Sequence, residues 1–373
     1  ARKESYNEQS RKPHVQPATV LEDLARRDFT INAMALNLIT NEFIDPFGGK
    51  NDIRSRIIRT PIDPDKTFYD DPLRILRGIR FATIFNFTIE PDTKQAMKKN
   101  ANRLLIVSQE RIADEIIKII SAKIPSTGFF LLYETGILEI ILPEVASLKE
   151  KKTHHPCKEL FEHTLQVLDN TAKLTKSPAL RIAALLHDIG KPKTLKVENG
   201  KVSFHRHEIV GAKACLKICD RLKLSQKDTE IISRIIKYHL RPHLLAKENP
   251  KDNALARFIR EIGPDMKGLF IIAQADITSQ NQKKVKQARE KILDLYERIK
   301  ALNKKMRLAR FKLAINGFDI MNILKIQPGK NVGNVKKKLE EMVLNGELHN
   351  KKTVLKKYLK EHCTLFISEE KQK

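Results

Sequence analysis

Cationic and acidic side chains that suit phosphate and sugar binding gather near the amino-terminal end of the chain. Arg26-Arg27-Asp28 places two guanidinium groups and one carboxylate directly before an apolar stretch. Guanidinium groups form paired hydrogen bonds to phosphate oxygens, and a carboxylate accepts hydrogen bonds from sugar hydroxyls. The same three residues also suit a surface salt-bridge cluster beside a helix, so residue types alone leave both interpretations open.

A second charged segment begins at Asp71-Pro72 and continues with Arg74, Arg77 and Arg80. The spacing of three residues puts these arginines along one edge of a helix. Like charges at this spacing repel one another unless an anion lies between them, which favours a phosphate or nucleotide partner. Asp71 and Arg74 lie one turn apart and offer an acceptor and a donor for the edge of a base. An Asp71 that caps the helix and pairs with Arg74 is compatible with this role.

Histidine and aspartate recur farther along the chain, in an order that suits metal binding. Neutral imidazole and carboxylate are ligands for divalent transition metals, and an adjacent His-Asp pair can reach one ion together. Any one of these histidines alone is more simply a core or surface residue, and their order carries the argument. The six residues of this set are His163, His187, Asp188, His207, His239 and Asp276.

Other histidines and cysteines fall outside this pattern. We expect surface positions for His154, His155, His205 and His243. Cys215 and Cys219 share a helix face but have no further His or Cys partners at zinc-site spacing, so we expect buried thiols. The full chain holds four cysteines, too few and too scattered for a disulfide framework, which fits a reducing cytoplasm.

The carboxyl-terminal region is rich in lysine and contains a glycine turn before a basic helix. Exposed backbone amides and ammonium groups there suit RNA phosphates, although a run of lysines is more often a solvated face. The residues concerned are Lys330, Lys336, Lys337 and Lys338.

Composition agrees with a nucleic-acid partner. The 373 residues include 70 Lys and Arg against 45 Asp and Glu, a net charge of +25. Such an excess indicates a polyanionic partner, with nucleic acid ahead of an anionic membrane surface. No apolar run approaches the ~18–20 residues of a membrane span, and the first residues contain no signal-peptide core.

The elements that position these residues are mostly helical. We expect short strands at 35–39, 42–44 and 57–60, and an almost wholly helical chain after Pro61 that includes a helix starting at Asp71-Pro72. Asn199-Gly200 indicates a small hairpin. Further helices are expected at 91–104, 108–121, 126–134, 136–147, 334–346 and 352–361, with helical periodicity over 160–302 and a linker at 149–155.

Four motifs together resemble one family. RRDFTINAMA, IDPFGG, DDPLRILRGIRFA and VSQERI, in this order, are similar to the bacterial-type tRNA nucleotidyltransferase and poly(A) polymerase family, whose CCA-adding members build the 3′ end of tRNA without a template. The resemblance implies a mainly α fold with a remnant of an α/β nucleotidyltransferase head. It implies a head at 1–60, a helical neck at 61–148, an HD-type helical body at 155–302 and a basic helical tail at 303–373.

The resemblance also implies residue roles. Arg26, Arg27 and Asp28 would hold the ribose and triphosphate of CTP or ATP, and Asp71 and Arg74 would hydrogen-bond the incoming base. Arg77, Glu110 and Arg111 would support this pocket, and residues 45–49 match a mobile stretch. Asp70 stands where many relatives carry Glu. The tail resembles the tRNA-binding region of the same enzymes, which favours RNA binding by its lysines.

One family element is missing. Nucleotidyl transfer in this family uses two Mg²⁺ ions held by an Asp-x-Asp strand after a Gly-Gly turn. The only Asp-x-Asp here is Asp63-Pro64-Asp65, which contains proline and follows no such turn, so we reject it as the metal site. We therefore expect no catalytic residue for nucleotidyl transfer in this chain and an amino-terminal portion that it lacks, consistent with its opening at Ala1.

The histidine pattern resembles the HD superfamily of metal-dependent phosphohydrolases. By that likeness His163, His187, Asp188 and Asp276 would bind a first transition metal, and His207 and His239 would complete a second. Lys191 would neutralise a phosphate. The expected function is therefore tRNA 3′-end nucleotidyl transfer from CTP and ATP, with an HD phosphohydrolase acting on 2′,3′-cyclic phosphates or phosphomonoesters, or a non-catalytic RNA-binding scaffold, as alternatives.

Overall fold

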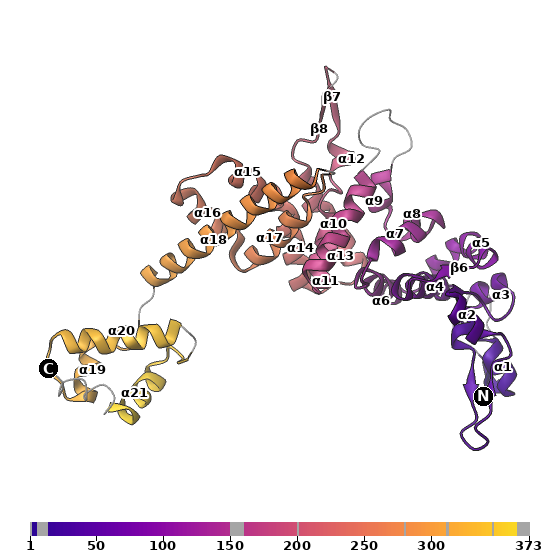
Figure 1. Ribbon diagram of the computed structural model, residues 1–373, viewed down its shortest axis with the longest axis horizontal. Coiled ribbons are helices and arrows are strands. Elements are labelled where there is room, and N and C mark those ends of the chain that lie inside the picture. The colour runs from indigo at the N-terminus through magenta and orange to yellow at the C-terminus, as the bar shows by residue number, and fades with distance from the viewer. Residues whose placement is uncertain are drawn as a thin grey trace. The chain divides into compact units, whose positions relative to one another are not determined.

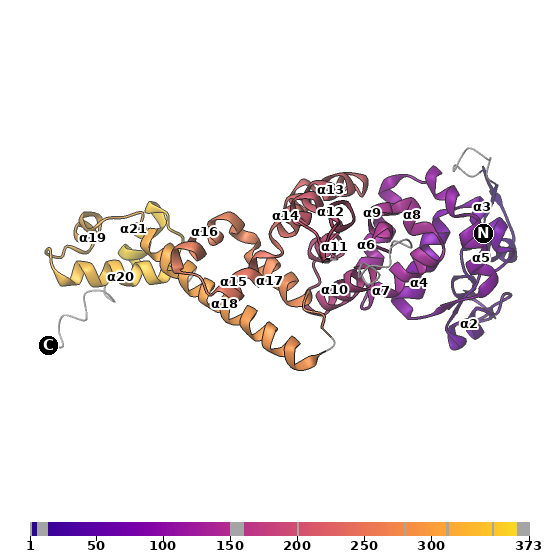
Figure 2. The same ribbon diagram turned by 90° about the horizontal axis from the view of Figure 1, so that it is seen from above.

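The chain forms two compact units in a computed structural model. The first comprises residues 1–299 and the second residues 300–373. The structure describes residues 2–5, 14–149, 160–199, 201–279, 281–310, 313–344 and 347–363, so the expected linker at 149–155 lies outside them except for Lys149. Helices dominate both units (Figures 1 and 2). No helix in these described ranges is both long and apolar enough to cross a membrane.

The first elements lie in the segment expected to form the head, and they are short. Thr19 caps α1 in a capping box with Glu22, and Asp45 caps α2 by accepting hydrogen bonds from the amides of Gly49 and Lys50. A Cβ at Gly49 would lie 2.2 Å from the Thr30 carbonyl oxygen, so only glycine lets α2 approach η1 this closely. The elements are β1 (Arg2–Ser5), β2 (His14–Pro17), α1 (Val20–Ala25), η1 (Thr30–Asn32), β3 (Ala35–Leu36), β4 (Phe43–Ile44), α2 (Gly49–Ser55) and β5 (Ile57–Ile58).

The segment expected to form the neck follows as a set of helices, several of which begin at a proline. Proline fixes the backbone of the first turn without losing a needed donor, as at the starts of α3, α5, α7 and α9. Its elements are α3 (Pro64–Asp70), α4 (Leu73–Phe85), β6 (Thr88–Ile89), α5 (Pro91–Lys99), η2 (Ala101–Ile106), α6 (Gln109–Ile120), α7 (Pro125–Glu134), α8 (Ile137–Ile141), α9 (Pro143–Ala146) and η3 (Ser147–Lys149).

A helical body carries the histidine-rich segment. Helices α10, α11, α14 and α17 contact one another, and a short hairpin, β7–β8, follows α12. Figure 1 shows this hairpin projecting beside α12. The elements are α10 (Leu160–Leu174), α11 (Pro178–Leu186), α12 (Lys191–Thr194), β7 (Lys196–Glu198), β8 (Lys201–Ser203), α13 (His207–Arg221), α14 (Gln226–Tyr238), α15 (Arg241–Glu248), α16 (Asp252–Ile262), η5 (Gly263–Asp265), α17 (Met266–Ala275) and α18 (Gln282–Arg310).

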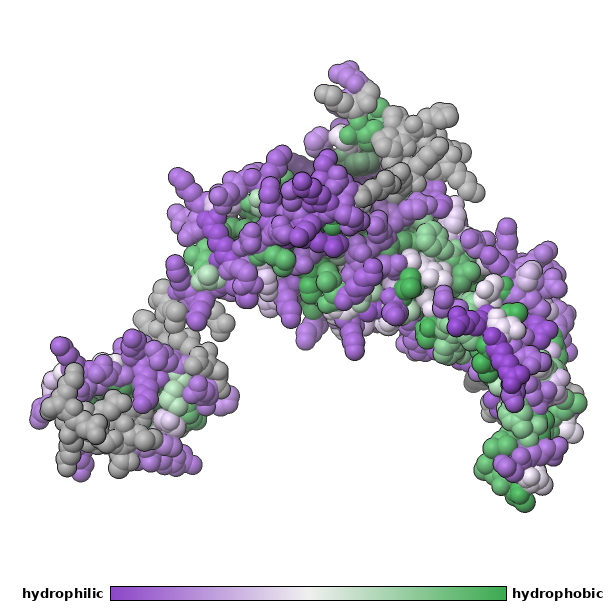
Figure 3. All heavy atoms as spheres, viewed as in Figure 1, coloured by the Kyte–Doolittle hydropathy of each residue, from purple (hydrophilic) through white to green (hydrophobic). Residues whose placement is uncertain are grey.

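The second unit has its own small core. Helices α19 (Gly317–Leu324), α20 (Lys330–Leu344) and α21 (Lys352–Glu361) bury a set of aliphatic side chains, while hydrophilic residues cover much of the visible face of both units (Figure 3). The core residues are Ile315, Ile320, Leu324, Val335, Leu339, Leu355 and Leu359.

The mainly α prediction is confirmed, with local differences. The expected strands shorten to two residues each, and β5 pairs in parallel with β6, a strand that the sequence did not indicate. The helix expected at 136–147 divides into α8 and α9, because Pro143 cannot continue α8. The hairpin at Asn199 forms as expected, with Asn199 in the left-handed region at φ 51°.

One buried cation joins the neck to the helical body. The Arg181 guanidinium, on α11, is 5% exposed and donates to the carbonyl oxygens of Ile120 and Ala122, at the end of α6, at 2.9 and 2.8 Å. It also donates to those of Ala172 and Thr175, at the end of α10, at 3.1 and 3.0 Å. The negative ends of two helix dipoles therefore compensate this charge.

Replacing this cation tests its role. Arg181→Met keeps an apolar stem of similar length but leaves four terminal carbonyls without a donor, so we expect the unfolding free energy to fall by about 2–4 kcal/mol. Denaturant titration followed by circular dichroism measures the change. The exposed Arg260→Met is the matched control, with an expected change within about 0.5 kcal/mol. Equal stability of the two variants would contradict the role of Arg181.

A candidate nucleotide pocket and a candidate metal centre

One cavity collects the charged residues of the amino-terminal motifs. It has a volume of about 560 Å³ and lies between the α1–η1 connection, the start of α4 and the first turn of α6. All seven residues that the sequence assigned to nucleotide binding line it, together with two that it did not: Arg26, Arg27, Asp28, Asp71, Arg74, Arg77 and Arg111, with Asn32 and Phe81.

Asp28 is the electrostatic centre of this pocket. Its carboxylate is buried, and Oδ2 accepts a hydrogen bond from Arg77 Nε at 2.8 Å. The other oxygen, Oδ1, accepts from the Phe29 amide and from Asn32 Nδ2, both at 3.0 Å. Asp28 therefore serves first as the counter-ion that fixes Arg77 and Asn32 in the pocket wall.

Arg74 and Asp71 are each engaged with the backbone. The Arg74 guanidinium donates to the Arg26 carbonyl oxygen at 2.7 Å, which ties α4 to the segment after α1. Asp71 Oδ1 accepts from the Leu73 amide at 3.2 Å, and Oδ2 lies 3.8 Å from the Arg111 guanidinium. Asp71 thus caps the first turn of α4, which is one of its two expected roles, and faces Arg111.

Phe81 supplies an apolar wall that the sequence analysis missed. The Arg77 and Arg80 guanidinium carbons lie 5.5 and 4.3 Å from the centroid of its ring. Arg80, third in the expected row of arginines, forms an ion pair with the buried Glu115 at 2.9 Å and does not line the pocket. An aromatic residue one helical turn after Arg77 is a local signal from which Phe81 could have been identified.

The rejected Asp-x-Asp segment serves the fold. Asp63 Oδ1 accepts from the Asp65 amide at the start of α3. The two oxygens of Asp65 accept from Lys99 Nζ and Asn100 Nδ2, at 2.6 and 2.8 Å. Asp63 is engaged in the first turn of α3 and Asp65 in holding α3 against the end of α5, so the two carboxylates do not fit a Mg²⁺ pair.

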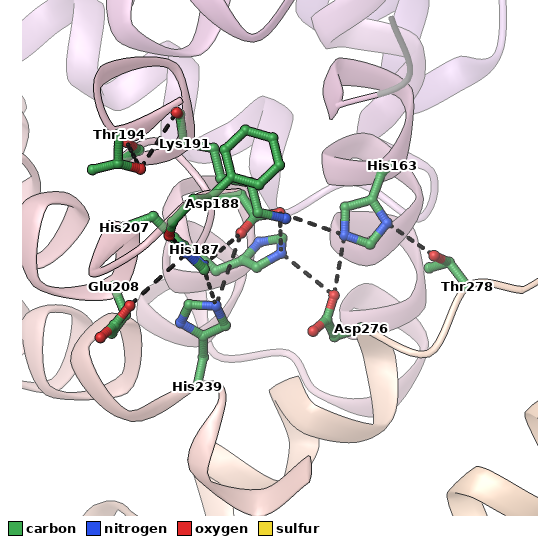
Figure 4. Close-up of polar contacts among 12 residues, drawn as sticks. His163, His187, Asp188, Lys191, Thr194, His207, Glu208, His239, Asp276 and Thr278 are labelled. Carbon is green, nitrogen blue, oxygen red and sulfur yellow. Dashed lines mark hydrogen bonds and ion pairs between the residues drawn. The ribbon is translucent and has the colours of Figure 1, made fainter. Parts of the chain in front are cut away.

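The six histidine and aspartate residues converge in the helical body (Figure 4). His163 comes from α10, His187 and Asp188 from the end of α11, His207 from the start of α13, His239 from the end of α14 and Asp276 from the end of α17. They form two groups in which the potential ligand atoms lie within 4.8 Å of one another. The groups are His163, His187 and Asp276, and Asp188, His207 and His239.

Asp188 faces both groups. Its Oδ2 lies 3.3 Å from His187 Nε2 and 3.7 Å from His163 Nε2, whereas Oδ1 lies 3.4 Å from His207 Nε2 and 3.8 Å from His239 Nε2. The resemblance had assigned this carboxylate to the first position alone. Its geometry lets it serve both positions.

The imidazole rings are oriented by hydrogen bonds on their outer nitrogens. Nδ1 of His187, His207 and His239 contacts the carbonyl oxygens of Ala184, Phe204 and Ile236, at 2.7, 2.9 and 2.7 Å. A carbonyl oxygen only accepts, so each Nδ1 carries a proton, and Nε2 of each ring faces the centre, where it can ligate a metal ion when the ring is neutral. This is the usual arrangement of metal-ligating histidines.

Two of these inward nitrogens face each other. Nε2 of His207 and Nε2 of His239 lie 3.3 Å apart, both buried. Two lone pairs at this distance repel unless a cation lies between or beside them. The donor set, four imidazoles and two carboxylates, therefore fits divalent transition-metal ions.

Electrostatics inside the centre agree with a need for positive charge. Although burial lowers it, the Asp188 and Asp276 carboxylates raise the pKa of His187 to about 10. Burial and the neighbouring His187 lower the pKa of His239 to about 4. The pKa values of both aspartates lie well below the usual value, because hydrogen bonds and charge from the histidines outweigh burial. A proton on His187 thus compensates carboxylate charge that a bound cation would otherwise balance.

Lys191 and Gly190 complete the segment after the His-Asp pair. Lys191 Nζ donates to Asp188 Oδ2 at 2.6 Å and lies 5.6 Å from the centroid of the Phe204 ring. A Cβ at Gly190 would lie 2.1 Å from the His207 carbonyl oxygen, so glycine allows α13 to approach and bring His207 to the centre. This close approach gives a physical reason for the glycine of HDIGK.

The histidines and cysteines outside the metal-binding pattern differ in their exposure. His205 is exposed, as expected, and His154 and His155 lie outside the described residues. His243 is not simply a surface residue: its Nε2 lies 3.5 Å from Asp276 Oδ2, because α15 turns back toward α17 directly after His239. Cys215 and Cys219 are buried free thiols, which confirms that expectation.

The lysines of the tail lie on α20 in the second unit. Lys330, Lys336, Lys337 and Lys338 are exposed, while Val335 and Leu339 of the same helix are buried. The helix therefore presents a cationic face to solvent.

Comparisons with known proteins cover nearly the whole chain. Family models match the poly(A) polymerase head domain at residues 1–59, a probable RNA and SrmB-binding site of polymerase A at 86–149, and the HD domain at 160–301. The "A-adding tRNA nucleotidyltransferase" of Deinococcus radiodurans is 33% identical over 350 residues, which cover 89% of this chain and 77% of that protein.

Two further relatives agree. The "Multifunctional CCA protein" of Methylococcus capsulatus is 35% identical over 235 residues, which span 61% of this chain and about half (54%) of that protein. A solved CCA-adding enzyme in its apo form II has a TM-score of 0.55 and 22% identity, and the match covers 96% of this chain and 75% of the other. This last likeness establishes the fold. The resemblance of the four motifs is confirmed, and the chain belongs to the bacterial-type family of CCA- and A-adding tRNA nucleotidyltransferases that carry an HD domain.

Proposed function

We propose that this chain selects CTP and ATP and binds tRNA for template-independent addition of nucleotides to the tRNA 3′ end, in the cytoplasm. The convergence of seven motif residues on one 560 Å³ cavity carries the proposal. The A-adding relative matches over most of its length, whereas the chain spans about half of the multifunctional relative.

The base is recognised by Asp71 and Arg74. Cytosine N4 and adenine N6 are amino donors that lie beside an accepting ring nitrogen, so one carboxylate and one guanidinium can read either base. Uracil and guanine present a carbonyl oxygen beside a ring N–H at this edge, which reverses the pattern. The tie from Arg74 to the Arg26 carbonyl oxygen preorganises the donor.

The triphosphate lies against the remaining guanidinium groups. Arg27 and Arg111 have half-exposed side chains, and Arg77 is held toward the cavity by Asp28. Guanidinium groups fixed in this way bind phosphate oxygens with little loss of side-chain freedom. Since Asp63 and Asp65 do not fit Mg²⁺, we assign the chain's own residues to nucleotide selection and derive no transfer step from them.

Binding of tRNA involves the exposed lysines of α20. Lys330 and the row from Lys336 to Lys338 present ammonium groups to solvent close to Gly329 and Gly333. Among the described residues, no atom beyond the local backbone lies within 4 Å of a Cβ placed at either glycine, so the start of this helix is open to a ligand. Ammonium groups placed in this way bind the RNA backbone without reading its sequence.

A second candidate function rests on the two donor groups around Asp188. We propose that the helical body binds two divalent transition-metal ions and hydrolyses 2′,3′-cyclic phosphates or phosphomonoesters. His163, His187 and Asp276 would hold the first ion, His207 and His239 the second, with Asp188 between them. Ions held by these residues would supply an activated water for hydrolysis of a phosphoester at neutral pH. Lys191 would orient a phosphate oxygen beside Asp188.

The base-reading role of Asp71 has a direct test. Asp71→Asn keeps the shape and the cap but replaces an accepting carboxylate with a weaker neutral group, so we expect about tenfold weaker binding of both CTP and ATP. Isothermal titration calorimetry measures both affinities. Asp114→Asn, an exposed acid on α6, is the control. Unchanged affinity of Asp71→Asn would contradict base recognition here.

The lysine face of α20 predicts a change in salt dependence. Replacement of Lys336, Lys337 and Lys338 by alanine removes ammonium groups that neutralise RNA phosphates. The slope of log K for tRNA against log salt should become shallower by about 0.7–0.9 for each phosphate that is no longer neutralised. Fluorescence anisotropy across a salt series measures it. Weaker binding with an unchanged slope would indicate altered folding of the second unit.

If the metal centre is correctly assigned, the chain should bind two Ni²⁺ ions when it is treated with EDTA and then dialysed against Ni²⁺. Asp188→Asn removes the charge shared by both positions, so both ions should bind at least tenfold more weakly, and hydrolysis of 2′,3′-cyclic AMP should be lost. Inductively coupled plasma mass spectrometry counts the ions. If Asp188→Asn still binds one ion tightly, the carboxylate is not shared between the two positions. If the wild type binds metal but hydrolyses no substrate, the phosphohydrolase proposal is wrong and the helical body serves as a non-catalytic scaffold.

A further inference from the structure

His243 stands apart from the six residues of the metal centre but points into it. Its Nε2 lies 3.5 Å from Oδ2 of Asp276 and is itself buried, with no hydrogen bond among the described residues, whereas the side chain as a whole is 31% exposed. A buried imidazole nitrogen without a partner is costly unless a nearby group uses it.

The Oδ2 atom of Asp276 needs a hydrogen-bond partner to fix the orientation of the carboxylate. Asp276 ends α17, and only Oδ1 faces the histidines of the centre, at 3.1 Å from His163 Nε2 and 3.4 Å from His187 Nε2. Rotation about the terminal bond of an aspartate is soft, so contacts to one of its two oxygens do not by themselves fix the carboxylate plane. His243 is the group that the described contacts place on Oδ2.

The position of His243 is fixed independently of Asp276. It belongs to α15, which contacts α17, and Pro242 and Leu245 beside it are buried. Arg241, at the start of the helix, lies over the Phe258 ring at 5.7 Å. The imidazole of His243 is thus held in place by a packed helix. A residue that orients another side chain must itself be held rigidly.

We propose that His243 is a positioning residue for the first metal position: its Nε2, 3.5 Å from Oδ2 of Asp276, moves close enough to donate a hydrogen bond to that oxygen and so keeps Oδ1 turned toward His163 and His187. This inference rests on the proposed metal centre. His243 is outside both groups whose donor atoms lie within 4.8 Å of one another, so it acts through Asp276 and not as a ligand.

Calorimetric titration of the EDTA-treated full chain with Ni²⁺ tests the proposal. His243→Ala should weaken the first of two binding events by about 10- to 100-fold and leave the second unchanged, because outer partners of ligands contribute at this level. His243→Gln should stay within about threefold of the wild type, since its amide can donate to Oδ2. His205→Ala, an exposed histidine of the same domain, is the control and should bind as the wild type does.

The outcomes distinguish a positioning role of His243 from direct ligation and from the absence of a metal centre. Equal Ni²⁺ binding by His243→Ala and wild type overturns the positioning role and leaves the metal centre intact. Equal losses in His243→Ala and His243→Gln overturn it in favour of direct ligation by the ring. A wild type that binds no Ni²⁺ overturns the metal centre itself, and the positioning role with it. Unfolding of the metal-free variants, followed by circular dichroism, should match the wild type, so that a loss of binding reports on the site.

Discussion

A buried carboxylate is stable only when its charge is compensated, and this constraint organises both candidate sites. Asp28 is buried among Arg77, Asn32 and the Phe29 amide, and the contacts that stabilise it also aim a guanidinium into the nucleotide pocket. Asp188 is buried among four histidine rings and Lys191. In each case the desolvation cost of one charge is offset by groups that the proposed function requires.

The two candidate sites are connected through helices α6 and α11. Helix α6 carries Arg111 in its first turn, at the nucleotide pocket, and its last carbonyls accept hydrogen bonds from Arg181. Arg181 lies on α11, whose last residue, Leu186, directly precedes His187 of the metal centre. The neck and the helical body are therefore joined by a buried polar contact that is satisfied only in one geometry. A shift of α11 against α6 would separate these carbonyls from the guanidinium that satisfies them.

Much of this arrangement was predictable because its signals are local. Pro64, Pro91 and Pro125 mark helix starts, and the motif residues Arg26 to Arg111 could be assigned to one pocket from their resemblance to a known family. The order of histidines and aspartates indicated a metal centre for the same reason. Each of these features depends on residue type and spacing along the chain.

Features that depend on distant contacts were not predictable. The pairing of Ile57 with Thr88 joins the expected strand β5 to β6, a two-residue strand that its own residues did not indicate. His243 looks like any exposed histidine until α15 packs on α17. The sharing of Asp188 between two positions, and the burial of Arg181 among carbonyls, follow from how helices far apart in sequence meet.

The central claim, that the pocket around Asp28 selects CTP and ATP, is tested most directly by a crystal structure of this chain with CTP. The account predicts the cytosine amino group on Asp71, its ring nitrogen on Arg74 and the phosphates on the guanidinium groups of Arg27, Arg77 and Arg111. A nucleotide bound outside this cavity, or an empty cavity at a CTP concentration that saturates the protein in solution, would contradict it.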